Sequence, residues 1–251
     1  MKCRYVCVMD VGPRTEQEDC ILIEHQVYQE DRLTTRAQYE SDFVIMAVCD
    51  GMGGHDAGEE ASRFVCEKLN TIVDLVDFSG ESLQTIMSLV QNSSTHCLPK
   101  GSGTTLAGLM AKNNRVIVFN AGDSRVYRIS EEGIQCVSQD HSLVQDLLTK
   151  GLINENDAFH HPYKNVVNFG IGPAFIKAKL KYDLNIFEED IYSDTFYLIC
   201  SDGVSDIMRN QEILDILGSE PLSRAENLIE ALKKIRLKDN TSFIIARIYH
   251  S

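Results

Sequence analysis

The chain lacks the features that mark membrane, secreted and repeat proteins. No run approaches the roughly 20 continuous apolar residues that a membrane-spanning helix needs, and the start MKCRYVCVMDVG is too short and interrupted for a secretory signal. It has no internal repeat, low-complexity tract or linker rich in proline or serine. We therefore expect a cytoplasmic protein with no membrane partner. Its 251 residues suit one large domain or two small ones.

The chain also lacks paired cysteines. Its eight cysteines include no Cys-x-x-Cys pair, so neither a zinc ribbon nor a thioredoxin-type motif is indicated. No cysteine is followed by five residues and an arginine, the loop of cysteine-dependent phosphatases. Cys49 and Cys200 lie in apolar runs, where a reduced thiol behaves as a small hydrophobe. We expect structural thiols.

Basic residues are scarce. Lysine and arginine number 24 against 37 acidic residues, which gives a formal net charge of −13. Such a field repels phosphate backbones, so we expect no nucleic-acid partner. Carboxylates gathered at one site would instead attract divalent cations, although ordinary solubility is the better explanation of the overall charge.

The order of apolar segments favours an α+β sandwich over an alternating βαβ fold. Short β-branched runs predict strands at 20–24 and 43–50, and we interpret the polar residues 25–42 between them as a surface loop or hairpin end. Helical spacing predicts helices over 56–76 and 81–93. The other predicted elements are an antiparallel meander over 103–138, a helix over 141–151 that stops at Gly151, strands near 176–184 and 195–200, helices over 211–218 and 222–235, and a strand over 241–249.

Acidic residues recur at the ends of these apolar strands. Asp50, Asp123 and Asp202 each follow a buried-looking run and sit beside a glycine, and Asp239 precedes the last strand. Each alone has a plain explanation as a turn or helix cap. Together they suit hard, oxygen-preferring cations such as Mg²⁺ or Mn²⁺. Two such ions about 3.5–4 Å apart activate water and clamp a phosphoryl oxygen.

Ordered motifs over nearly the whole chain resemble the metal-dependent protein phosphatases, the protein phosphatase 2C family, and especially its compact bacterial-type members. These motifs are GPRTEQED (12–19), CDGMGGHDAGEEAS (49–62), GSGTTLAGL (101–109), NAGDSRVYRI (120–129), QDHSLVQDLLTKGLI (139–153), HPYKN (161–165), LICSDGVSD (198–206) and KDNTS (238–242). Any one would be weak evidence, whereas eight in the family order are strong evidence.

The resemblance implies a single catalytic domain over 1–251, an α-β-β-α sandwich of two mainly antiparallel sheets flanked by helix pairs. It implies two Mn²⁺ or Mg²⁺ ions between the sheets, a possible third ion, and a flap at about 140–170 that influences substrate access. The activity implied is hydrolysis of phosphoserine and phosphothreonine in proteins by a metal-activated water, without a phosphoenzyme, in opposition to a serine/threonine kinase. We expect a monomer.

Site residues follow from the same resemblance, position by position. The implied metal ligands are Asp50, which would bridge both ions, the carbonyl of Gly51, Asp202 and Asp239, with Asp123 on a third, weaker ion. Arg14 would hold the substrate phosphate, because a guanidinium fork suits phosphate oxygens. Glu18 and Asp19 would act through metal-bound waters. Ser201 lacks a paired base, so we interpret it as structural.

The chain departs from the family pattern at a few positions. Gln17 stands where the first motif usually has Asn, NFGIG (168–172) replaces Thr-Arg-x-Leu-Gly, and Leu237-Lys238 replaces Gly-Gly before the final acid. Animal members have a histidine directly after Asp-Gly, where this chain has Met52. The nearest imidazole, His55, suits a general acid, and it equally suits a helix-start residue bonded to the backbone.

Two alternatives to a protein phosphatase stay open from the residues alone. One is a degenerate member that binds phosphoproteins without turnover, motivated by the altered flap and final motif. The other is a metal hydrolase of small phosphomonoesters, because residues around the flap would set that preference.

Overall fold

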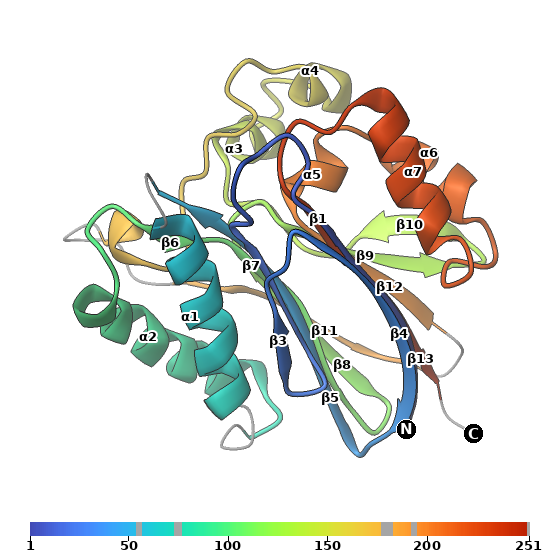
Figure 1. Ribbon diagram of the computed structural model, residues 1–251, viewed down its shortest axis with the longest axis horizontal. Coiled ribbons are helices and arrows are strands. Elements are labelled where there is room, and N and C mark those ends of the chain that lie inside the picture. The colour runs from blue at the N-terminus through green and yellow to red at the C-terminus, as the bar shows by residue number, and fades with distance from the viewer. Residues whose placement is uncertain (54–56, 73–76, 177–182, 192–194, 250–251) are drawn as a thin grey trace.

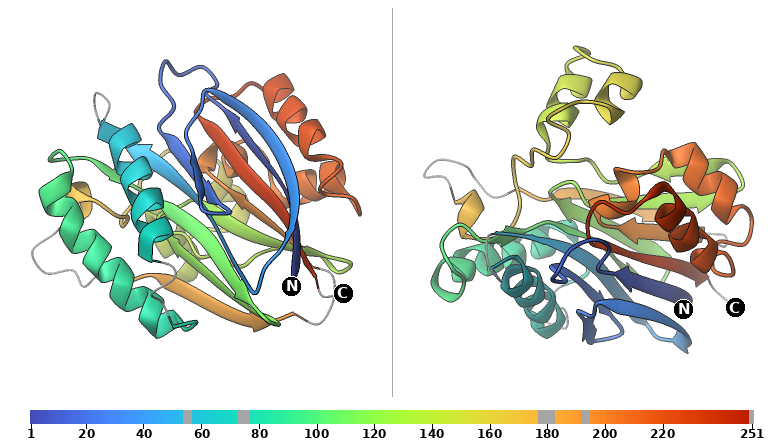
Figure 2. Two further views of the ribbon diagram at one scale, coloured as in Figure 1. Left: turned by 60° about the horizontal axis from the view of Figure 1, so that its bottom comes forward. Right: turned by 45° about the horizontal axis from the view of Figure 1, so that its top comes forward.

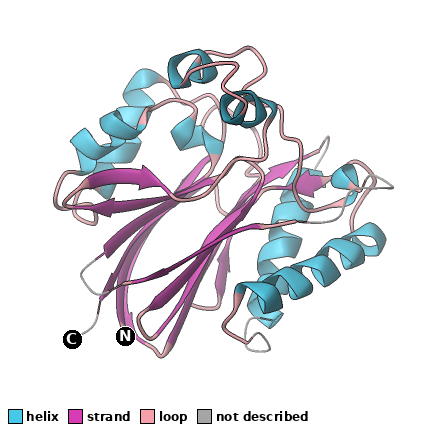
Figure 3. Ribbon diagram, turned by 180° about the vertical axis from the view of Figure 1, so that it is seen from behind, coloured by secondary structure: helices cyan, strands magenta, loops and turns pink. Residues whose placement is uncertain are grey.

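Two antiparallel β-sheets lie face to face at the centre of the molecule, with helices over both outer faces (Figures 1 and 3). The computed structural model describes residues 1–53, 57–72, 77–176, 183–191 and 195–249. The predicted α-β-β-α sandwich is confirmed. No helix in the described part of the chain is long and apolar enough to span a membrane.

The first sheet contains both terminal strands of the chain. Its order is β10 (Gly133–Cys136), β9 (Arg125–Ser130), β12 (Thr195–Cys200), β13 (Thr241–Tyr249), β1 (Lys2–Asp10) and β4 (Arg32–Glu40). Helices α5 (Asp202–Ser205), α6 (Asn210–Leu217) and α7 (Ala225–Ile235) belong to this side. Apolar side chains of α6 and α7 pack with those of β12 and β13 in one buried cluster.

The second sheet carries the other half of the sandwich. Its order is β11 (Asn185–Asp190), β8 (Arg115–Ala121), β7 (Leu106–Lys112), β5 (Phe43–Met52), β2 (Asp19–Ile23) and β3 (Gln26–Tyr28), with β6 (Gly103–Thr104) paired to β5. Helices α1 (Ala57–Ile72) and α2 (Gly80–Cys97) cover its outer face.

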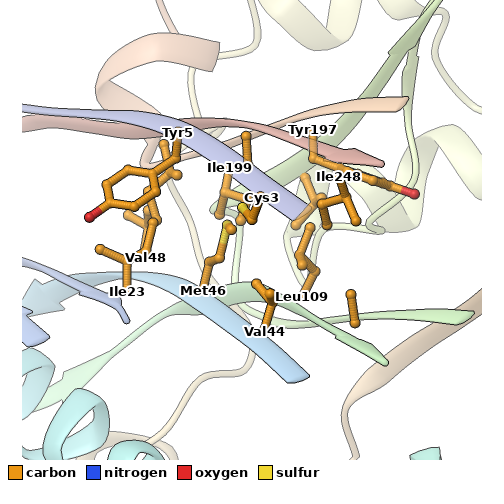
Figure 4. Packing of buried hydrophobic residues seen from close by; sticks show 14 of the residues in the cluster. Cys3, Tyr5, Ile23, Val44, Met46, Val48, Leu109, Tyr197, Ile199 and Ile248 are labelled. Carbon is orange, nitrogen blue, oxygen red and sulfur yellow. The ribbon is translucent and has the colours of Figure 1, made fainter. Parts of the chain in front are cut away.

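The central core lies between the sheets. Met46 and Leu109 from the second sheet face Tyr197 and Ile199 from the first (Figure 4). Strands β5 and β12 are continuous apolar runs because one face of each meets the other sheet while the opposite face lies under helices. Neighbouring strands in both sheets of the described chain are antiparallel. The last residues of one strand therefore lie beside the first residues of its neighbour, at the same end of the sheet.

One local prediction was wrong. Residues 25–42 contain β3 and the nine-residue strand β4, because β4 is an edge strand that alternates half-buried with exposed positions and so carries polar side chains. Most of the strand expected near 176–184 lies outside the described part, at residues 177–182; the next described strand, β11, begins at Asn185.

The segment at 140–170, here called the flap, stands away from the sandwich (Figure 2, right). It carries the short helices α3 (Leu143–Thr149) and α4 (Glu155–Phe159), and the sequence had predicted only the first of these. Gly151 follows α3 with a φ of 66°, in agreement with its predicted role as the stop.

Candidate metal centre

The acidic residues singled out in the sequence come from strand ends that meet at one edge of the sandwich. Asp19 opens β2 and is the register partner of Asp50, near the end of β5. Asp202 follows β12, and Asp239 precedes the antiparallel neighbour β13. Because antiparallel neighbours run in opposite directions, the end of one lies beside the start of the other.

Mutual repulsion and burial raise the pKa values of this cluster. The pKa of Asp19, which is fully buried, rises to about 7, first through burial and then through Asp202 and Asp239. The pKa of Asp202 also rises to about 7, through burial, Asp206 and Asp239. Burial and the neighbouring acids raise the pKa of Asp50 well above its usual range. A divalent cation bound among these carboxylates would lower their pKa values again, because it stabilises the charged form.

Two buried carboxylate oxygens lack any hydrogen-bond partner within the described residues: Asp19 Oδ1 and Asp202 Oδ1. Buried polar atoms are nearly always paired, so these oxygens fit an acceptor role toward a cation or toward a water molecule bound to one. The all-oxygen donor set suits Mg²⁺ or Mn²⁺. The side chains do not yet form a closed ligand set: among the described residues, no three His, Cys, Asp or Glu side chains form a group that could hold an ion as they stand.

An ion pair with Arg14 holds one of the predicted metal ligands, Asp239. Arg14 Nη2 donates to Asp239 Oδ2 at 2.5 Å, and the Arg14 side chain is half exposed. The guanidinium proposed for phosphate is therefore paired with a carboxylate proposed for a metal ion. Binding a cation at Asp239 would release Arg14, and a phosphate dianion offers it an alternative bidentate partner.

Backbone packing brings Gly51 and Glu18 into the same corner. A β-carbon on Gly51 would collide with the carbonyl oxygen of Gly58, at the start of α1, and one on Gly58 would collide with Glu18 Oε1. Both glycines therefore permit a close approach of β5, α1 and the loop before β2. Burial is the largest cause that raises the pKa of Glu18, and Arg14 opposes it.

Other residues hold the acids in place: Ser201, which the sequence indicated to be structural, and Thr105, for which no role was predicted. Ser201 Oγ donates to Asp19 Oδ2 at 2.9 Å and accepts from Ser242 N at 3.1 Å. Thr105 Oγ1 accepts from Asp50 N at 3.0 Å. The available signals were the small hydroxyl residues in the motifs CSD (200–202), GTT (103–105) and NTS (240–242).

Asn240 organises the loop that carries Arg14 and Glu18. Its Oδ1 accepts from Glu18 N at 2.8 Å, and its Nδ2 donates to the carbonyls of Val11 and Glu16 at 3.0 Å each. The Asn of the KDN motif is therefore a structural brace. It fixes the entry to β2 from the far end of the chain.

Asp123 lies in the turn after β8 and is largely buried. Burial and then Asp202 raise the pKa of Asp123 well above its usual range. The preceding residue, Gly122, donates its N–H to His141 Nδ1 at 3.2 Å, and His141 N donates to Gly122 O at 2.8 Å. The base of the flap is thus tied to the turn that carries Asp123.

His55, the possible general acid, lies outside the described residues. The other acids named from the sequence converge at the same edge, as the electrostatic coupling between Asp19, Asp50, Asp202 and Asp239 indicates. Asp123 couples to the cluster through Asp202.

Comparisons with known proteins identify relatives over most of the chain. The family model described as protein phosphatase 2C matches residues 23–235. The serine/threonine phosphatase stp of Listeria monocytogenes is 32% identical over 187 residues, which cover 70% of this chain and 72% of that protein. Protein phosphatase PhpP of Streptococcus pneumoniae is 32% identical over 197 residues, with 74% and 78% covered.

Solved structures agree with the fold. The serine/threonine phosphatase PstP/Ppp of Mycobacterium tuberculosis matches with a TM-score of 0.79 and 26% identity over the whole of both chains. Stp1 of Staphylococcus aureus matches with a TM-score of 0.80 and 27% identity over 98% of this chain and 95% of that one. The PstP catalytic domain described in complex with two manganese ions has a TM-score of 0.76 and 24% identity, with 99% and 100% covered.

Proposed function

This chain belongs to the protein phosphatase 2C family and is a serine/threonine protein phosphatase, and we propose that its catalytic centre is the acidic cluster at the sandwich edge. The observation that carries the proposal is the pair of buried, unpartnered oxygens Asp19 Oδ1 and Asp202 Oδ1 within a group of carboxylates of raised pKa. Phosphoryl transfer needs mainly positioning and charge neutralisation, which such a site supplies.

We propose that Asp50, the Gly51 carbonyl, Asp202 and Asp239 hold two Mn²⁺ or Mg²⁺ ions, with Asp123 at a third, weaker ion. Bound ions of this kind lower the pKa of a water to make it a nucleophile and offset the charge of the phosphoryl oxygens. Glu18 and Asp19 act from the next layer through water. Ser201 keeps the Asp19 carboxylate in one orientation through its 2.9 Å hydrogen bond.

Arg14 is proposed to bind the substrate phosphate. Support comes from its half-exposed guanidinium at the rim of the cluster, where phosphate would replace Asp239 as its partner. His55 is proposed as the general acid for the leaving alkoxide. The substrate is a phosphoserine or phosphothreonine protein, and a serine/threonine kinase is proposed as the opposing enzyme. We also propose that the chain acts in the cytoplasm as a single-domain monomer.

The test is hydrolysis of phosphoserine and phosphothreonine peptides with Mn²⁺, with Mg²⁺, and with EDTA. We expect activity with either metal and none with EDTA. Asp50→Asn is compared with Asp42→Asn, because Asp42 lies in the turn at the opposite end of strand β5 and is exposed. Full activity of Asp50→Asn would refute the metal assignment. Binding of phosphopeptide without turnover would instead support the degenerate member, and a preference for small phosphomonoesters would support the metabolite hydrolase.

A further inference from the structure

A cleft of about 740 Å³ opens from the acidic cluster and runs beneath the flap. Asp123 and Asp202 line it where it meets the cluster, Leu148 and Phe159 of the flap helices form one wall, and Ile134 of β10 belongs to the other. Figure 2 (right) shows the flap helices and the helical side of the first sheet standing apart. The cleft is continuous with the proposed catalytic centre and too extended for a phosphate group alone.

Strand β10 is the free edge of the first sheet, and it faces this cleft. Its only strand neighbour among the described residues is β9. Gly133 closes the two-residue turn opposite Ser130, and Val137 N donates to Val126 O. Hydrogen-bonded pairs alternate along an antiparallel ladder, so Gly133, Gln135 and Val137 point their backbone groups toward β9.

The intervening residues, Ile134 and Cys136, therefore direct their N–H and C=O groups toward the cleft. Within the described chain no other backbone group is bonded to them. Unpaired strand groups of this kind recruit an extended peptide, and pockets beside them select its side chains. Four residues of free edge offer two N–H and two C=O groups to such a peptide.

Charges along the cleft indicate which peptide fits. Asp140 is paired with Arg125 and Asp206 with Lys164. The guanidinium of Arg209 lies 4.9 Å from the Phe159 ring centroid and donates to Asn156, so it is directed at the flap.

Two acids on opposite walls, Glu132 and Glu155, have no ion pair among the described residues. Their free carboxylates favour a basic side chain in the occupant of the cleft.

We propose that the segment of the substrate protein that flanks the phosphoresidue binds in this cleft as an extended strand on β10, with a basic side chain near Glu132. This inference rests on the proposed phosphatase function and adds its mode of substrate recognition. The phosphoresidue would lie at the acidic cluster, where Asp123 lines the cleft. Cys136 is the register partner of Tyr127, which lies four positions after Asp123. Because both strands advance about 3.3 Å per residue, the first peptide residue bonded to β10 should lie about four residues from the phosphoresidue.

The experiment uses phosphothreonine peptides in which one backbone amide at a time is N-methylated, over eight residues on each side. We expect kcat/KM to fall about 3–10-fold at alternate positions on one side only, beginning about four residues from the phosphothreonine, because each methyl group removes one strand hydrogen bond. Equal effects at consecutive positions, or no effect on either side, would overturn strand addition.

A matched pair of enzyme variants tests the charge preference. Glu132 lines the cleft, whereas its neighbour Glu131 in the same turn does not. We expect Glu132→Lys to lower kcat/KM about 3–10-fold for a peptide with Lys about eight residues from the phosphothreonine and to leave hydrolysis of a Glu-substituted peptide unchanged. Glu131→Lys should change neither value. An equal response to both variants would refute this part of the proposal.

p-Nitrophenyl phosphate separates this inference from the proposed function, because it reaches the acidic cluster without entering the rest of the cleft. Metal-dependent hydrolysis of this ester, together with a flat N-methylation profile on hydrolysed phosphopeptides, would reject strand addition alone. Failure to hydrolyse either substrate with metal would reject the proposed function itself.

Discussion

The acid-bearing edge of the sandwich and the flap line the same cleft, but different interactions hold them. Asp19 and Asp50 sit on paired strands whose register is fixed along whole ladders, and Asp123, Asp202 and Asp239 lie within two residues of a strand end. A small number of side-chain contacts tie the flap to the body: Asp140 to Arg125, Lys164 to Asp206, Arg209 to Asn156 and Phe159, and His141 at the base to Gly122. The proposed catalytic centre therefore depends on strand register, whereas the flap, which forms one wall of the proposed substrate cleft, depends on a small number of side-chain contacts.

The largest expected effect comes from breaking the acid-bearing edge. Asp202→Asn removes a carboxylate from the cluster while keeping its shape, and we expect kcat/KM to fall on the order of 10²–10³-fold for phosphopeptide and p-nitrophenyl phosphate alike. Steady-state kinetics at saturating Mn²⁺ measure this loss. A selective loss on peptide alone would place Asp202 in substrate recognition rather than in the metal centre.

A smaller effect should follow from removing the support of an acid. Ser201→Ala deletes the hydroxyl that donates to Asp19, and we expect Mn²⁺ affinity to drop about 10–100-fold while the fold persists. Isothermal titration measures the affinity. Ser223→Ala is the control, because among the described residues Ser223 Oγ bonds only to Glu220, in its own exposed turn. Equal affinities in the two variants would contradict a positioning role for Ser201.

The flap should respond differently. Arg209→Ala removes the contacts to Asn156 and Phe159, and we expect phosphopeptide kcat/KM to change about 3–10-fold, with p-nitrophenyl phosphate hydrolysis changed less than about twofold. Comparing the two substrates in one preparation measures the split. A proportional loss on both substrates would show that the flap contact supports the catalytic centre directly.

The smallest expected effect concerns stability in the absence of metal. The pKa of Asp19 rises from 3.8 unfolded to about 7 folded, so its contribution is present below about pH 4 and is lost as pH rises toward 7. We expect the Tm of metal-free protein to be about 5 °C lower at pH 8 than at pH 5, because about 1 kcal/mol shifts Tm by 2–4 °C in a domain of this size. Calorimetry with and without Mn²⁺ checks it.

Saturating Mn²⁺ should abolish most of this difference, since it favours the charged acids. A metal-free Tm that rises steadily from pH 5 to pH 8 would contradict the described carboxylate cluster.

Much of the acid-bearing edge was predictable from the sequence because buried strands are apolar runs and their ends are marked by Asp beside Gly. Strand β4 was not, because half-exposed edge positions carry polar side chains that read as a loop. The pairing of Arg14 with Asp239 joins residues 225 positions apart, and no local pattern encodes it. The brace of Asn240 depends on the same long-range closure.

The acids at this edge of the sandwich are proposed to form a binuclear metal centre. Manganese EPR combined with equilibrium dialysis tests it most directly, because two Mn²⁺ ions about 3.5–4 Å apart are spin-coupled. We predict at least two Mn²⁺ per wild-type chain and in Asp42→Asn, with a coupled spectrum that Asp50→Asn abolishes. A single uncoupled ion in wild type, or an unchanged coupled spectrum in Asp50→Asn, would contradict the account.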